Sequence, residues 1–203
     1  MQIGGIILCG GKSTRMGTSK SLLPFGPETM LQRVVRLLGE VVSPIVVVAA
    51  PDQDLPPLPA SILIARDERE GNGPLEGLRA GLKALPENVD AAYATSCDVP
   101  LLVPTFVRRM IDLLGENHIA VPETEGFPHP FSAVYRRSVL EHVEQLLAAN
   151  RLRPVFLFDA VPTRRVQASE LIDVDPQLRT LFNLNRREDY LAALAEEGFS
   201  PAN

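Results

Sequence analysis

The chain has 203 residues, of which 45% are hydrophobic and 22% are charged. That size and apolar share suffice for one domain with its own core, and no run of 18 apolar residues suggests a membrane span. The 20 basic and 25 acidic residues give a net charge of −5, and basic residues form no run longer than an Arg-Arg pair, which argues against a nucleic-acid surface. We therefore expect a single domain, residues 1–203, that binds small ligands and neither nucleic acid nor membrane.

The cysteines and the N-terminus indicate a cytoplasmic protein. Met1 and Gln2 lead straight into an apolar stretch, without the charged region and cleavage site of a signal peptide. Cys9 and Cys97 are the only cysteines, and no second Cys or His stands at metal-ligand spacing from either. We interpret both as small buried thiols near strand ends.

Short apolar runs alternate with helical patterns along most of the chain. Strands are expected at Ile3–Cys9, Pro44–Ala49, Ile62–Ala65, Ala91–Ser96, Ile119–Val121 and Ser132–Tyr135, with weaker patterns at Arg165–Gln167 and Leu181–Leu184. Helices are expected at Thr29–Gly39, Leu75–Leu85, after Pro104, at Ser138–Ala148 and at Glu188–Glu196. Continuous apolar strands separated by helices predict a three-layer α/β sandwich with a mostly parallel sheet.

The segment from Leu8 to Lys20, LCGGKSTRMGTSK, follows the first expected strand and has neither a helical nor a strand pattern. Its three glycines allow the backbone to approach a ligand closely, and Lys12, Arg15 and Lys20 supply three cations. This pattern indicates a loop that binds the phosphates of a nucleotide. A purely structural glycine-rich turn is the alternative.

A Walker P-loop does not fit this segment. Gly11-Lys12-Ser13 supplies the end of that motif, but its leading glycine would have to stand at Ile6. Gly5 lies one residue too early, and no helical apolar pattern follows Ser13 directly.

Polar residues follow the expected strands where ligands of such sheets bind, outside the carboxyl ends. Five segments belong to this set: the glycine-rich loop, Arg66-Asp67, Cys97-Asp98, Glu123–His129 and Asn183–Asn185. Asp98 ends a buried strand, and its carboxylate suits a Mg²⁺ ion completed by water and phosphate oxygens. A helix-capping role for Asp98 is disfavoured because Pro104 lies six residues away.

The other candidates leave alternatives open. Asp67 precedes Gly71–Gly77, a glycine-rich entry into a helix that suits a base or ribose but also an ordinary turn. His129 stands between two prolines and offers a rigid ring to a polar ligand, or is a plain surface histidine. Asn183 and Asn185 alternate, so we expect both amides on the same side of a strand, facing a phosphate or heterocycle or each satisfied locally.

Several motifs together resemble the molybdenum cofactor guanylyltransferases, the MobA-like nucleotidyltransferases. They are LCGGKSTRMGTSK, GPLEGL, CDVP, HPFSAVY and NLNRREDY, in the family's order and over nearly the whole chain. The resemblance implies a Rossmann-like nucleotidyltransferase fold. It also implies a Mg²⁺-dependent reaction in which GTP and molybdopterin give the guanine dinucleotide cofactor and pyrophosphate. Proteins that insert or accept the cofactor are further partners that it suggests.

The family's functional residues transfer to this chain by matching position. Leu8, Cys9 and Gly10, with Gly11, match the segment at the guanine end of GTP, Arg15 and Lys20 match phosphate-binding cations, Asp67 matches a nucleotide contact, and Asp98 matches the magnesium ligand. His129, Asn183 and Asn185 match positions on the pterin side. The resemblance thus divides the domain into a nucleotide-binding half, residues 1–100, and an acceptor-binding half, residues 101–203.

The chain departs from the family pattern in three places. Cys9 replaces the commoner alanine, Ala49 stands where some members carry an asparagine near the nucleotide, and Arg186-Arg187 replaces Thr-Pro. Two other functions stay open: a related nucleotidyltransferase that uses CTP or a sugar-phosphate-type acceptor, and a non-catalytic nucleotide-binding protein.

Overall fold

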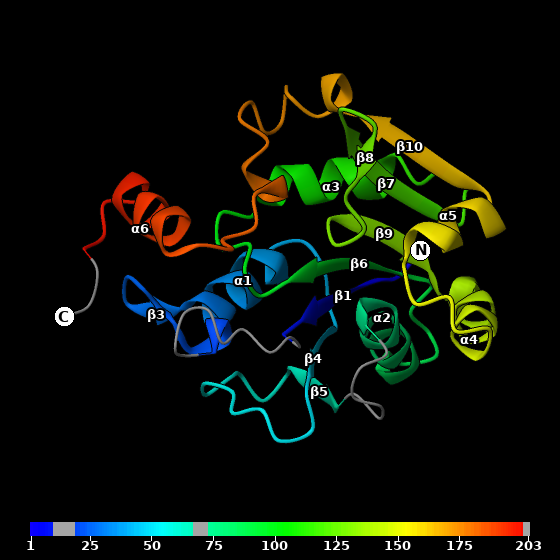
Figure 1. Ribbon diagram of the computed structural model, residues 1–203, viewed down its shortest axis with the longest axis horizontal. Coiled ribbons are helices and arrows are strands. Elements are labelled where there is room, and N and C mark those ends of the chain that lie inside the picture. Colours follow the sequence, from blue (N-terminus) through cyan, green and yellow to red (C-terminus); the bar gives the residue numbers. More distant parts are fainter. Residues whose placement is uncertain (10–18, 67–72, 201–203) are drawn as a thin grey trace.

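The computed structural model describes residues 1–9, 19–66 and 73–200. One large sheet runs through the molecule in the order β10-β7-β9-β6-β1-β4-β5, with β8 paired to β7 (Figure 1). Its strands are β1 (Ile3–Leu8), β4 (Ile45–Ala49), β5 (Leu63–Arg66), β6 (Ala91–Ser96), β7 (Ile119–Thr124), β8 (Phe127–Pro128), β9 (Ala133–Arg136) and β10 (Thr163–Gln167). A two-stranded hairpin, β2 (Pro24–Phe25) and β3 (Glu28–Thr29), lies apart from this sheet.

The sheet is mostly parallel, as the sequence predicts. β1 pairs in parallel with β4 and β6, β4 with β5, and β7 with β10. β9 is antiparallel to both neighbours, β6 and β7, and β8 is antiparallel to β7. The carboxyl ends of β1, β4, β5, β6, β7 and β10 therefore share one edge of the sheet.

Six α-helices are described, and several short 3₁₀ turns accompany them. The helices are α1 (Met30–Gly39), α2 (Gly73–Ala84), α3 (Pro104–Asp112), α4 (Leu140–Ala148), α5 (Val155–Ala160) and α6 (Arg187–Glu196). The 3₁₀ turns are η2 (Lys20–Leu22), η3 (Arg137–Val139), η4 (Ala168–Glu170) and η5 (Arg179–Leu181). The start of α1 is fixed by a capping box, because the Thr29 side chain accepts from Gln32 N and the Gln32 side chain accepts from Thr29 N.

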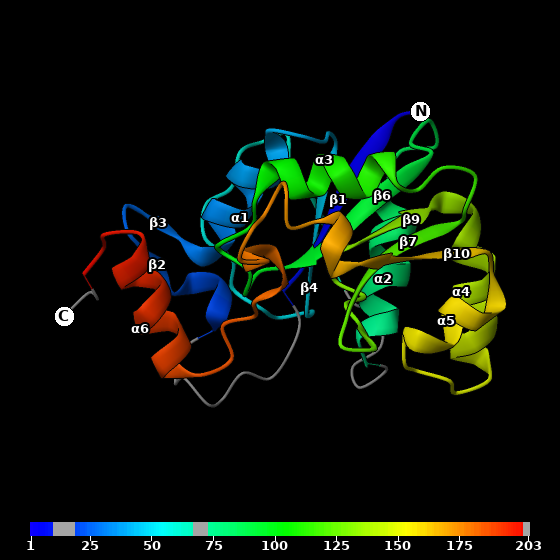
Figure 2. The ribbon, with the colours of Figure 1, turned by 90° about the horizontal axis from the view of Figure 1, so that it is seen from above.

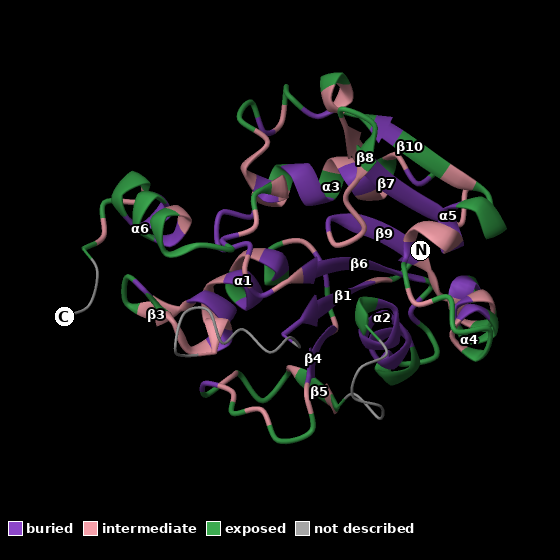
Figure 3. Ribbon diagram, viewed as in Figure 1, coloured by how far each residue is buried: buried purple, intermediate pink, exposed green. Residues whose placement is uncertain are grey.

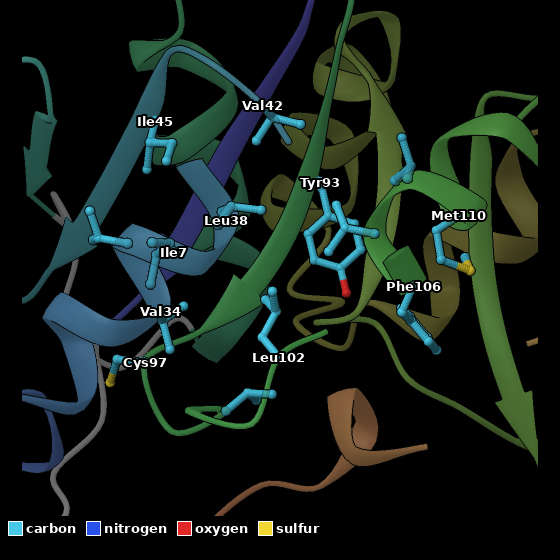
Figure 4. Close-up of a cluster of buried hydrophobic side chains, with 14 of the residues drawn as sticks. Ile7, Val34, Leu38, Val42, Ile45, Tyr93, Cys97, Leu102, Phe106 and Met110 are labelled. Carbon is cyan, nitrogen blue, oxygen red and sulfur yellow. The ribbon is translucent and has the colours of Figure 1, made fainter. Parts of the chain in front are cut away.

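Helices cover both faces of the sheet (Figure 2). One buried cluster joins α1 and α3 to side chains such as Ile7 and Tyr93 (Figure 4). The opposite face, which includes Ile6, packs against α2, α4 and α5. Neighbouring residues of β1 thus serve opposite layers, as the period of two in a strand requires. The predicted three-layer α/β sandwich is confirmed.

α2 approaches β1 closely because it carries a glycine at the contact. A Cβ atom added at Gly81 would lie 2.5 Å from Ile6 Cγ2, which is closer than such atoms can pack. A larger residue at this position would therefore require the Ile6 side chain or the helix itself to shift.

α6 packs against a smaller cluster of its own rather than against the main sheet. That cluster includes Phe25 of the hairpin, Leu184 and Tyr190, and the outward side of α6 is exposed (Figure 3). It fixes the chain segment that leads into α6, and that segment contains Asn183 and Asn185.

The prediction of a strand at Leu181–Leu184 is wrong. Residues Arg179–Leu181 form a 3₁₀ turn, and the chain after it does not join the sheet. The buried Asp175 carboxylate organises this turn by accepting from Thr180 N and Thr180 Oγ1 at 2.9 and 2.8 Å. Leu184 N then donates to Asp98 O at 2.9 Å, so the segment crosses the end of β6 instead of extending the sheet.

Several short elements of the fold were not predicted from the sequence. They are α5, the hairpin β2-β3 and strand β8. α5 has six residues and each of these three strands only two, so none shows enough periods of a pattern to be recognised.

Candidate functional site

The candidate site is built around Asp98, two residues beyond the end of β6. Its side chain is 14% exposed. Oδ1 accepts hydrogen bonds from Ser96 Oγ and from Asn183 Nδ2, the latter at 2.8 Å. Oδ2 accepts from Lys20 Nζ at 2.8 Å. The carboxylate is therefore held in one orientation at the carboxyl edge of the sheet.

Lys20 reaches Asp98 from the start of η2, which follows residues 10–18. Its ammonium group donates to Asp98 Oδ2 and to Asn185 Oδ1, at 2.8 and 2.9 Å. An ammonium has three hydrogens, so one donor position is left beyond these two contacts. Lys20 is 15% exposed at its side chain and can still offer this charge to an anion.

Asn183 and Asn185 meet the same pair of charged residues. Asn183 Nδ2 donates to Asp98 Oδ1 and to Ser96 Oγ, at 2.8 and 3.1 Å. Asn185 Oδ1 accepts from Lys20, while Leu184 between them is fully buried. The expected alternation of the two amides is therefore present, although the segment is not a strand.

The structure thus brings together Lys20, Asp98, Asn183 and Asn185 from three widely separated parts of the sequence. Ser96 belongs to this group and was not singled out from the sequence. The signal for it was its position two residues before Asp98, at the end of the same buried strand.

An open pocket of about 890 Å³ adjoins this cluster. Its wall consists of Phe182, Asn183, Asn185, Arg186, Arg187, Glu188 and Asp189. Pockets that bind small molecules have volumes of roughly 300–1,000 Å³. Arg186-Arg187, the departure from the family pattern, therefore lies in the wall of a pocket that begins at the two asparagines.

Leu8 and Cys9 lie where expected, at the carboxyl end of β1, and Cys97 lies beside them. The register pairs Leu8 with Ser96, and Cys97 N donates to Leu8 O at 3.0 Å. A hydrogen bond with the Cys97 thiol, followed by burial, raises the pKa of Cys9 well above its ordinary value. Cys9 is therefore a protonated, buried thiol, in line with the structural role expected for it, and its proximity to Cys97 was not foreseen.

His129 lies on a different part of the same edge, beyond the β7-β8 hairpin. Its Nε2 is 2.7 Å from Thr124 Oγ1, and its backbone N donates to Pro122 O at 2.9 Å. Burial lowers the pKa of His129 below its ordinary value of 6.5. No hydrogen bond described for His129 joins it to Asp98 or Lys20.

Four other site candidates, Gly10, Gly11, Arg15 and Asp67, lie outside the described residues.

The residues around Asp98 determine which kind of metal site its carboxylate can form. Within residues 1–9, 19–66 and 73–200, no group of three or more His, Cys, Asp or Glu side chains gathers as metal ligands. A carboxylate has about four acceptor positions, and three are used here by Ser96, Asn183 and Lys20. The donor set fits an ion held by one carboxylate and completed by substrate and water, which is how Mg²⁺ usually binds. It does not fit a cage of protein ligands.

None of the helices in the described part of the chain has the length and apolar character needed to cross a membrane.

Comparisons with known proteins give the chain a family. Residues 5–164 match the model of the MobA-like NTP transferase domain. A protein of Mycobacterium avium named probable molybdenum cofactor guanylyltransferase is 38% identical over 201 residues, which cover 97% of this chain and 96% of the relative.

Solved structures agree on the fold. Molybdopterin-guanine dinucleotide biosynthesis protein A from Archaeoglobus fulgidus superposes with a TM-score of 0.79 at 16% identity, covering 98% of this chain and 99% of the other. The 2-C-methyl-D-erythritol 4-phosphate cytidylyltransferase of Thermus thermophilus has a TM-score of 0.68 at 15% identity, covering 97% and 98%. The fold is thus shared by proteins named for guanine and for cytidylyl chemistry. The sequence match at 38% identity is to a protein named probable molybdenum cofactor guanylyltransferase. From the domain match and the 38% identity over nearly its whole length, the chain belongs to the MobA-like NTP transferase family.

Proposed function

We propose that the protein transfers GMP from GTP to the terminal phosphate of molybdopterin and releases pyrophosphate, in a reaction that requires Mg²⁺. The observation that carries this proposal is the cluster of Lys20, Asp98, Asn183 and Asn185 at the carboxyl edge of the sheet, in which Lys20 is the last residue of the glycine-rich segment Leu8–Lys20. The relative from Mycobacterium avium, 38% identical, is named for this activity.

The nucleotide would bind between β1 and the 10–18 segment. Leu8, Cys9, Gly10 and Gly11 are proposed to meet the guanine end through backbone groups, and Asp67 to add a nucleotide contact. Arg15 and Lys20 are proposed to bind the phosphates. Lys20 supports this role because its ammonium group lies at the end of that segment and keeps a free donor position.

Mg²⁺ is proposed to bind Asp98, where it would neutralise charge on the triphosphate and on the leaving pyrophosphate. Ser96 and Asn183 orient the carboxylate by donating to Oδ1, so Oδ2, which accepts from Lys20, is the oxygen that would hold the ion. Binding of a triphosphate gives Lys20 a stronger anionic partner, so we expect it to turn from Asp98 toward the phosphates. That movement would free Oδ2.

The transfer itself needs position and charge rather than a protein base. A terminal phosphate oxygen of the acceptor attacks the α-phosphorus in line and forms the new P–O bond. The bond from the α-phosphorus to the oxygen bridging to the β-phosphorus breaks, and its electron pair leaves with pyrophosphate. The attacking phosphate is already an anion near neutral pH, so no general base has to remove a proton.

The acceptor is proposed to bind His129, Asn183 and Asn185. The asparagines support this because they form part of the wall of the 890 Å³ pocket and also contact Lys20 and Asp98. They would therefore stand at the junction where the acceptor phosphate meets the nucleotide.

Cys9 and Cys97 are free thiols, which agrees with the proposed cytoplasmic location.

Pyrophosphate release with each of GTP, ATP, CTP and UTP, with and without molybdopterin, tests the proposal. We expect release only with GTP, acceptor and Mg²⁺ together, and its loss when EDTA is added. A preference for CTP would indicate the related nucleotidyltransferase, whose fold this chain also shares. Binding of GTP without any turnover would indicate a non-catalytic protein.

A further inference from the structure

Gln53 lies four residues beyond the end of β4 and touches both residues that flank the 10–18 segment. Its side-chain Nε2 donates to Cys9 O at 3.0 Å and to Ser19 Oγ at 3.2 Å. The same atom lies 3.3 Å from Ser21 Oγ, and Ser21 is fully buried. One side-chain amide thus joins the end of β1 to the start of η2.

Gln53 is itself held in place from the neighbouring strands. Ala50 N donates to Gln53 Oε1 at 3.2 Å. Arg66, the last residue of β5, donates from Nη1 to Ala50 O and to Gln53 O, both at 2.8 Å. β4 lies between β1 and β5 in the sheet (Figure 1). The contacts of Gln53 with Cys9, Ala50 and Arg66 therefore connect the carboxyl ends of all three strands.

The amide nitrogen of the Gln53 side chain is fully used in these contacts. Its two hydrogens are shared among three acceptors, and the side-chain oxygen accepts a backbone N–H. Gln53 therefore has no unused N–H with which to recognise a base. Glutamate at this position has the same length but, when ionised, cannot donate to Cys9 O.

We infer that Gln53 is a positioning residue that fixes the separation of Cys9 and Ser19 and thereby sets the affinity of the site for the nucleoside triphosphate. The inference rests on the proposed function, since Lys20, the residue after Ser19, is a proposed phosphate-binding cation. By holding Ser19 and Ser21, Gln53 fixes the start of η2, where Lys20 projects toward Asp98.

Titration of GTP into the wild type and into Gln53→Glu and Gln53→Ala, without acceptor, tests the inference. We expect both variants to bind GTP about 5- to 30-fold more weakly, as loss of one or two net hydrogen bonds implies. The KM for the acceptor should stay within about twofold, because the acceptor pocket does not include Gln53. Gln145→Ala is the matched control, since its side-chain amide donates to Glu141 on the exposed side of α4.

A double-mutant cycle with Ser19→Ala separates positioning from a general loss of stability. The effects of Ser19→Ala and Gln53→Ala on GTP affinity should be clearly less than additive, because the two variants remove the same hydrogen bond. If Gln53→Ala does not fold, Gln53→Glu, with its unchanged length, is used in the cycle.

Two outcomes would overturn the inference. If both Gln53 variants bind GTP with the affinity of the wild type, even with lower melting temperatures, Gln53 contributes only to the stability of the fold. A wild type that binds no nucleoside triphosphate would overturn the proposed function and this inference with it.

Discussion

Asn183 Nδ2 lies 2.8 Å from Asp98 Oδ1, although 85 positions separate the two residues in the chain. Asn183 belongs to the half of the chain expected to bind the acceptor, and Asp98 is the proposed metal ligand of the nucleotide half. Their contact means that the two expected halves meet at one carboxylate. Changes in the acceptor half can therefore alter the charged centre directly, which shapes the first prediction.

Asn183→Ala should lower kcat and raise the Mg²⁺ concentration needed for half-maximal activity. The variant removes a donor that orients the Asp98 carboxylate. Loss of one hydrogen bond to a charged group costs about 1.5–3 kcal/mol, which corresponds to a decrease in kcat of roughly 10- to 150-fold. Asn88→Ala, at an exposed position, is the control. A change confined to the KM of molybdopterin, with Mg²⁺ dependence unaltered, would restrict Asn183 to acceptor binding.

Asp98→Asn should abolish turnover with little effect on the fold. The side chain lies at the edge of the sheet rather than in the core, while the exchange removes the charge proposed to hold the metal. Thermal melting beside a pyrophosphate-release assay checks both parts, with Asp52→Asn as an exposed control. Near-normal Mg²⁺-dependent turnover in a folded variant would contradict the metal assignment.

Lys20→Ala and Arg15→Ala should each reduce the rate by on the order of 10²-fold or more, because each removes a cation that faces developing phosphate charge. Lys83→Ala removes an exposed lysine from α2 and should leave the rate unchanged. Steady-state kinetics with GTP gives the comparison. Decreases below about threefold in both site variants would show that the glycine-rich segment has a structural role.

GTP should bind far more tightly than ATP or CTP in competition titrations. Backbone groups at Leu8–Gly10 and the Asp67 carboxylate are proposed to pair with the guanine N1 and N2 hydrogens. A site built to pair such groups discriminates against analogues that lack them by a factor on the order of 10⁴. Asp67→Asn should reduce the preference, and equal binding of CTP by the wild type would argue for the cytidylyl alternative.

His129 should titrate below pH 6.5 in NMR spectra, because burial lowers the pKa of its ring. The folded protein then binds a proton less readily than the unfolded chain does. The neutral ring contributes stability that is fully present above pH 6.5 and is lost as the pH falls through the folded-state pKa. His129→Gln should flatten this part of the stability profile measured by urea unfolding. An unchanged profile would show that His129 titrates alike in both states.

The sequence by itself determined the layers of the fold and the residue types of the site. β6 was predicted with its full bounds, α1 was predicted at Thr29–Gly39 and α3 after Pro104, because the apolar period of a helix or strand depends on a few neighbouring residues. Asp98 could be located because a charged residue at the end of a buried strand is visible locally. Lys20 and the glycines could be located because their pattern is contiguous.

Tertiary structure alone decided which of these residues meet. Leu181–Leu184 has an apolar pattern that suits a strand, yet the buried Asp175 carboxylate and the contact of Leu184 N with Asp98 O place it across the end of β6. Gln53 carried no signal at all, since a glutamine in the connection between β4 and β5 has no local pattern, and its role depends on Cys9 and Ser19, which lie more than 30 positions away. Periodicity reports the environment of one segment, whereas hydrogen-bond partners across the edge of a sheet depend on the order in which the strands assemble.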